Sequence, residues 1–153
     1  MTTRKFDSFS DLSSRVGEEL GISDWFEVTQ ERISAFASAS DDFQWIHLDV
    51  ERARAESPYR ATIAHGFLTL SLLVPLYGSA LSLGGSKMVV NYGLNRVRFT
   101  SAVLAGDRIR ARFTLLEYVD LDPGAQFTWK CTVEREGAEK PAVVAEWIKR
   151  HYP

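Results

Sequence analysis

Two aspartates and a histidine gather in one short stretch, ASASDDFQWIHLD at residues 37–49. Histidine exchanges a proton near neutral pH, and a carboxylate can orient the imidazole or share a water molecule with it. Asp42 and His47 are five positions apart, so they would diverge on a continuous helix, whereas a turn between them would bring both onto one water. The structural alternative is that the aspartates end a helix and His47 is a surface residue.

A second stretch, ATIAHGFLTLSL at residues 61–72, leads through a glycine into a strongly apolar segment. The first N–H groups of a helix lack partners within it and lie at its positive end. Glycine lets a ligand approach such a backbone closely, so the Gly66 N–H could hold the oxygen of a developing enolate. Alternatively, Gly66 only permits tight packing and His65 caps the helix. Together, the two stretches suit proton transfer next to a polarised carbonyl.

These stretches resemble the MaoC-like dehydratase family, which includes the (R)-specific enoyl-CoA hydratases and the NodN-like nodulation proteins. The aspartate and histidine of the family pattern fall on Asp42 and His47. The family's His-Gly before a hydrophobic helix falls on AHGFLTLSL at 64–72. A third stretch, NYGLNRVRFTSAVLAGDRIRAR at 91–112, resembles the family's strand, loop and Gly-Asp entry to the next strand. Trp45 and the NYGLN segment are most similar to the NodN-like branch.

The sequence departs from the family pattern at two places. Asp41 stands where the family has a glycine, and Gln44-Trp45 replaces the common Asn-Pro pair. These changes affect the expected substrate range more than the reaction class, because Asp42 and His47 are both present.

The resemblance implies a hotdog fold in a homodimer and a hydro-lyase acting on trans-2-enoyl or (R)-3-hydroxyacyl thioesters. The Gly66 N–H would bind the thioester oxygen, while Asp42 and His47 would hold a water over C3. Ser71 aligns with a family serine near the pocket, or bonds the carbonyl four residues earlier in its own helix. Asn95 would line the acyl tunnel. The surface residues that could bind coenzyme A phosphates are Arg96, Arg98 and Lys149.

Three functions remain open from the sequence. The favoured one is an (R)-specific enoyl-CoA hydratase or 3-hydroxyacyl thioester dehydratase. The alternatives are a hotdog acyl-CoA thioesterase and a non-catalytic subunit that binds acyl thioesters. No metal or redox cofactor is expected, because neither a ligand spacing nor a glycine-rich fingerprint is present. Coenzyme A or an acyl carrier protein would carry the substrate.

The elements that must position these residues follow from local patterns. A helix is expected over 8–20, ending at Gly21, then a short strand over 24–28. Thr29 should cap a helix through about 39, and Asp49 a second one over 50–55. Residues 66–81 are expected to form a helix that is apolar all round and hence buried on most sides, and Pro75 should kink it unless the chain already bends there. Strands are expected over 87–99, bulged at Gly93, and over 107–118, 126–134 and 142–151. These patterns predict an α+β fold in which an antiparallel sheet wraps around one long buried helix.

Length and composition fit one domain over residues 1–153. The formal net charge is −2, which gives no electrostatic footprint for nucleic acid. Cys131 is the single cysteine, so a reducing cytoplasm fits. The apolar stretch 67–83 is too short and too interrupted for a membrane span, and the N-terminal residues have no apolar core of signal-peptide length.

Overall fold

Alternating side chains along the C-terminal half build a curved antiparallel sheet. The computed structural model describes residues 2–153. Strands β6 (Arg108–Asp120), β7 (Ala125–Arg135) and β8 (Val143–Tyr152) are consecutive antiparallel neighbours. On β8 every second side chain from Val143 to His151 is buried, as expected for a strand with one face on a core. The predicted meander is therefore confirmed.

The full sheet has the order β2-β6-β7-β8-β5, in which β2 is Glu19–Ile22 and β5 is Met88–Phe99. Strand β3 (Phe26–Glu27) also pairs with β6, and β1 (Arg4–Phe6) pairs in parallel with β4 (Leu81–Leu83). The register of β5 against β8 shifts between Asn91 and Gly93, close to the predicted bulge.

The helix predicted over 8–20 is wrong in its second half. A 3₁₀ helix, η1 (Phe9–Arg15), occupies the first part, and β2 follows it. Leu20 is buried while the β2 backbone pairs with β6, so a contact distant in sequence overrides local helix preference. Gly21 lies inside the strand, where an added Cβ would come within 2.9 Å of the Leu81 side chain. It permits this close approach and does not end a helix.

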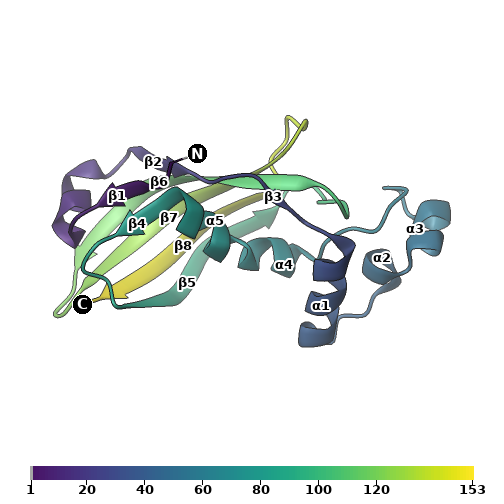
Figure 1. The fold of residues 1–153 in the computed structure, drawn as a ribbon, viewed down its shortest axis with the longest axis horizontal. Coiled ribbons are helices and arrows are strands. Elements are labelled where there is room, and N and C mark those ends of the chain that lie inside the picture. The colour runs from purple at the N-terminus through teal and green to yellow at the C-terminus, as the bar shows by residue number, and fades with distance from the viewer. Residues whose placement is uncertain (1) are drawn as a thin grey trace.

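The central helix has two segments, α4 (Gly66–Ser71) and α5 (Leu73–Ala80), with Leu72 at the junction. Pro75 falls in the first turn of α5, where a missing N–H removes no helical hydrogen bond. The sheet curves around these segments, as Figure 1 shows, and the predicted hotdog architecture is confirmed. Seven residues of this region are buried: Leu68, Thr69, Leu72, Leu73, Leu76, Tyr77 and Ala80.

The expectation that this helix is buried on most sides is only partly correct. Phe67 in α4 is 69% exposed and Val74 in α5 is 51% exposed. The edge strand β5 is likewise exposed along nearly its whole length. Its large apolar side chains in contact with solvent are Met88, Val89, Val90, Tyr92, Leu94 and Phe99.

Three helices gather beyond the start of α4, at one end of the sheet (Figure 1): α1 (Gln30–Ser40), α2 (Trp45–Leu48) and α3 (Val50–Glu56). The Thr29 side chain accepts a hydrogen bond at the start of α1, and Asp49 does the same for α3, so both predicted caps are confirmed. Asp41 ends α1 in the left-handed region, at φ 58° and ψ 22°. Within residues 2–153, no helix is both long and apolar enough to cross a membrane.

Candidate functional site

The predicted acid–base pair is brought together by a sharp turn after α1. The left-handed conformation of Asp41 reverses the chain, and Asp42 follows in the short connection to α2. His47 lies on α2 and is only 6% exposed. Ligand-type atoms of Asp42, His47 and His65 all lie within 4.8 Å of one another. This spacing lets one water molecule contact both predicted residues.

The surroundings of His47 define which nitrogen is free. Its Nδ1 lies 2.6 Å from the carbonyl oxygen of Ile63, so the neutral ring donates its proton there. Nε2 then carries the lone pair that can accept a proton from water. Burial lowers the pKa of His47, and the hydrogen bond to Ile63 opposes that effect. The neutral, proton-accepting form is therefore favoured at neutral pH.

His65 is a third member of the site that sequence reasoning did not assign to it. Its ring stacks on that of His47, with centroids 3.7 Å apart and planes 24° from parallel. Its Nε2 lies 3.0 Å from the backbone oxygen of Asp42, to which it donates. His65 is the N-cap of α4, but its side chain makes no capping hydrogen bond. One ring thus connects the Asp42 turn, the His47 imidazole and the start of the central helix.

Gly66 is the first residue of α4 and borders a cavity of about 270 Å³. A Cβ built on Gly66 would lie 3.0 Å from the Phe99 ring, which also lines this cavity. Glycine therefore keeps the cavity beside the helix start open. Because Gly66 directly follows His65, a carbonyl held at its N–H would lie next to the Asp42–His47 pair.

Comparison with known proteins agrees with this geometry. The family model for the MaoC like domain matches residues 11–134, a span that contains the whole cluster and most of the sheet. The chain belongs to the MaoC-like domain family. The resemblance found in the sequence is confirmed.

Two curated relatives of this MaoC-like chain match nearly its whole length. The 3-hydroxyacyl-thioester dehydratase Z of Mycobacterium tuberculosis (strain ATCC 25618 / H37Rv) is 49% identical over 149 residues, which is 97% of this chain and 98% of that protein. The nodulation protein N of Rhizobium leguminosarum bv. viciae is 48% identical over 92% of this chain and 89% of its own length. The unliganded R-hydratase PhaJ1 of Pseudomonas aeruginosa shares the fold, with a TM-score of 0.75 at 24% identity over 95% of this chain and 85% of that one.

The remaining predicted residues lie apart from the cluster. Ser71, at the end of α4, donates to the Leu68 carbonyl oxygen at 2.7 Å, which is a bond within its own helix but to the carbonyl three residues earlier and not four. It also borders a second cavity, of about 150 Å³. Asn95 is exposed on β5, where the register shifts between Leu94 and Arg96. Roles in substrate binding remain predictions for both residues.

The predicted phosphate-binding residues divide into two kinds. Arg96 and Arg98 are exposed on β5. Lys149 is 5% exposed and shares a face of β8 with Trp147 and Ala145, so the expectation of a surface lysine is wrong. The burial of Lys149 could have been predicted from the alternation along β8, because every second residue of a strand points to the same face of the sheet.

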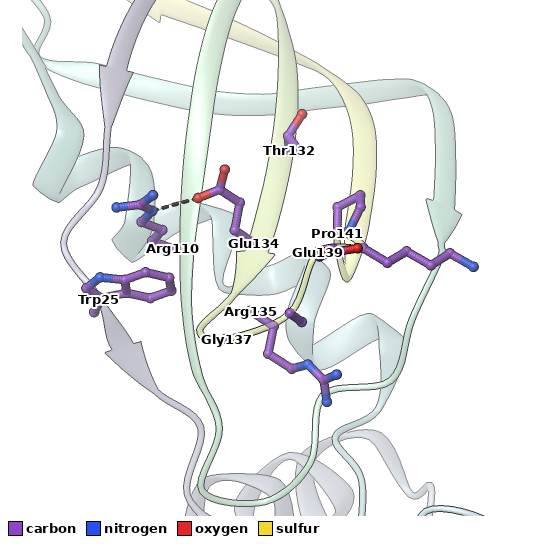
Figure 2. Close-up of a pocket in the computed structure, with 10 residues that line it drawn as sticks. Trp25, Arg110, Thr132, Glu134, Arg135, Gly137, Glu139 and Pro141 are labelled. Carbon is purple, nitrogen blue, oxygen red and sulfur yellow. Dashed lines mark hydrogen bonds and ion pairs between the residues drawn. The ribbon is translucent and has the colours of Figure 1, made fainter.

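A hollow of about 360 Å³ on the outer face of the sheet is a poorer candidate (Figure 2). Its walls include Trp25, Arg110 and Glu134, together with the turn over residues 135–141. Arg110 and Arg112 both bond the Glu134 carboxylate, at 2.7 and 2.6 Å. These charges are already paired, and the hollow contains no histidine.

Proposed function

We propose that this MaoC-like chain is a hydro-lyase that adds water to trans-2-enoyl thioesters or removes it from (R)-3-hydroxyacyl thioesters. The carrying observation is that Asp42 and His47 converge within 4.8 Å, beside a helix that starts at Gly66. The 49% identity to a 3-hydroxyacyl-thioester dehydratase over nearly the full length supports the same reaction class. The site has the acid–base groups and backbone donor that this chemistry needs.

In the hydration direction, the thioester oxygen accepts the Gly66 N–H, which polarises the conjugated double bond. A water molecule lies between the Asp42 carboxylate and Nε2 of His47. Its oxygen bonds to C3 as one of these two groups takes its proton, and C2 receives a proton in return. One O–H bond of water and the C2–C3 π bond are broken, C3–O and C2–H bonds form, and the net oxidation level of the substrate is unchanged. The same groups acting in reverse dehydrate the 3-hydroxyacyl thioester.

We propose that the reaction uses no metal or redox cofactor, and that coenzyme A or an acyl carrier protein carries the acyl chain. The rings of His47 and His65 are stacked and nearly parallel. One nitrogen of each ring is already occupied, since Nδ1 of His47 contacts the Ile63 carbonyl oxygen and Nε2 of His65 contacts the Asp42 backbone oxygen. Proton transfer by Asp42 and His47 balances the hydration without further components.

We also propose that the protein is a homodimer joined through β5. The exposed apolar side chains of β5 lie beside those of α4 and α5, because the Phe99 ring contacts Phe67 and Leu94 lines a cavity together with Val74. An unpaired sheet edge of this kind favours pairing with a second copy. Light scattering should give a mass near twice 17.2 kDa. A Leu94→Asp variant should shift the population towards the monomer; a wild-type monomer at micromolar concentration would contradict the proposal.

One assay separates the three candidate functions. With crotonyl-CoA as substrate, loss of enoyl absorbance without release of free thiol indicates hydration. Release of thiol indicates a thioesterase, and neither change indicates a non-catalytic binding subunit. We expect the first result, because a histidine paired with the aspartate and a backbone donor at the thioester carbonyl suit addition of water to C3. A cytoplasmic location remains a prediction from the single cysteine.

A further inference from the structure

Lys149 is a buried cation with no anionic partner. Its ammonium lies 3.4 Å from the centroid of the Tyr77 ring and 4.5 Å from that of Trp147. The side chain is 5% exposed, and no residue between 2 and 153 forms an ion pair or hydrogen bond with Nζ. Cation–π contacts offset only part of the desolvation of an ammonium group. A lysine in this position therefore indicates a site for an anion.

A second unsatisfied group lies beside it. His151 follows Lys149 on the same face of β8 and is 2% exposed. Its Nδ1 bonds the Ser86 hydroxyl at 3.1 Å, while its Nε2 is buried without a partner in the described chain. Burial lowers the pKa of Lys149 to about 8, so the ammonium remains mostly protonated at pH 7.

Lys149 and His151 both line a cavity of about 360 Å³ between α5, β5 and β8. Most of its wall is apolar. The polar lining residues besides these two are Ser86 and Asn91, and the remaining ones are Val74, Tyr77, Gly78, Leu81, Leu83 and Val89. An apolar cavity with a few polar groups on one wall is the usual form of a small-molecule site.

The cavity lies further along the central helix than the reaction site. Tyr77 is eleven residues after Gly66, which corresponds to about 16 Å along a helix. Val74 and Asn91 line both this cavity and the smaller one beside Ser71, so the two cavities adjoin. An apolar chain lying along α4 and α5 could thus end at Lys149.

We propose that this cavity binds a carboxylate carried on an apolar chain, with the Lys149 ammonium as its ion-pair partner. The carboxylate has two possible sources. It is either the distal end of an acyl thioester whose other end lies at Gly66, or the head of a free fatty acid. The first source rests on the hydro-lyase function proposed above, whereas the second is independent of it.

Binding of decanoate and of decanol, measured by calorimetry, tests the shared chemistry without any turnover. Wild-type protein should bind decanoate about tenfold or more tightly than decanol, because only the carboxylate can form the charge-assisted bond. Lys149→Met should reduce decanoate affinity about tenfold and leave decanol affinity unchanged, which also shows that the cavity remains folded. Lys130→Met, an exposed lysine on β7, is the matched control and should bind as wild type does.

A second arm identifies the source. Hydration of a trans-2-enoyl-CoA with a terminal carboxylate is compared with that of the same chain ending in methyl, for wild type and Lys149→Met. If Lys149→Met lowers kcat/KM only for the carboxylated substrate, the carboxylate belongs to the substrate. If the ratio of kcat/KM for the two substrates is the same in wild type and Lys149→Met, the carboxylate belongs to a free fatty acid. Equal decanoate binding by wild type and Lys149→Met overturns the proposal. If no thioester is hydrated but decanoate binding still depends on Lys149, the anion site stands and the hydro-lyase function fails.

Discussion

Replacing His65 by phenylalanine tests how the site is held together. Phenylalanine preserves a ring that can stack on His47, but removes the hydrogen bond from Nε2 to the Asp42 backbone oxygen. Leaving a partly buried carbonyl oxygen without its donor costs about 1–3 kcal/mol of folding free energy. The Asp42 turn loses its link to the central helix, and a displacement of about 1 Å is sufficient to lower turnover about 10²-fold.

The same variant has a second, independent effect. Burial is the main cause of the lowered pKa of His47, and the neighbouring His65 lowers it further. Removing His65 therefore raises the pKa of His47. With neutral His47 as the group that takes the proton from water through its free Nε2, the acid limb of the kcat/KM profile should move to higher pH.

The assay is the pH dependence of crotonyl-CoA hydration for wild type, His65→Phe and a control, Phe36→Leu. Phe36 packs on the His65 ring with centroids 5.0 Å apart, but makes no hydrogen bond to it. The control should lower stability while its acid limb stays in place. If His65→Phe hydrates crotonyl-CoA at the wild-type rate and the acid limb of its pH profile does not move, His65 has no positioning role.

Three further predictions concern the helix start, the turn and the stability of the fold. Gly66→Val should lose most hydration activity while the dimer persists, because its Cβ would meet the Phe99 ring at 3.0 Å; normal turnover would place the thioester oxygen elsewhere. Asp41→Gly should retain activity within about tenfold and gain up to about 1 kcal/mol, since glycine adopts φ 58° without strain; denaturant unfolding showing a clear loss would contradict this. Burial, together with the nearby charge of Lys149, lowers the pKa of His151 to about 4, compared with 6.5 in the unfolded chain. Between pH 4 and pH 6.5 the unfolded state therefore binds more protons than the folded state. The free energy of unfolding should therefore fall by about 3 kcal/mol from pH 6.5 to pH 4, and much of that fall should vanish in His151→Phe.

Most of what the sequence predicted correctly depends on contacts within a few residues. The Thr29 and Asp49 caps bond backbone groups three positions ahead, and the alternation of β6, β7 and β8 repeats every two residues. The Asp42–His47 pair could also be predicted, because only five positions separate the two residues. The left-handed Asp41 explains why the family pattern has glycine there.

The errors arise where partners are distant in the chain. Strand β2 forms because Gly21 and Ile22 pair with β6 about ninety residues later, and nothing local to 8–20 reveals that partner. The role of His65 depends on the packing of α2 against the start of α4, which periodicity alone does not determine. The prediction that Lys149 lies on the surface was avoidable, because the strand itself was predicted and the alternation of its side chains shows which ones face the core.

The most direct test of the central claim is the hydration rate of crotonyl-CoA for wild type, Asp42→Asn, His47→Gln and the double variant, with the mass of each checked. Each single change should lower kcat/KM by about 10²–10⁴-fold, because each removes one proton-transfer group. If both groups hold the same water, the double variant should be scarcely slower than the slower single one. Near-normal rates in the single variants, or losses that multiply in the double variant, would contradict the account.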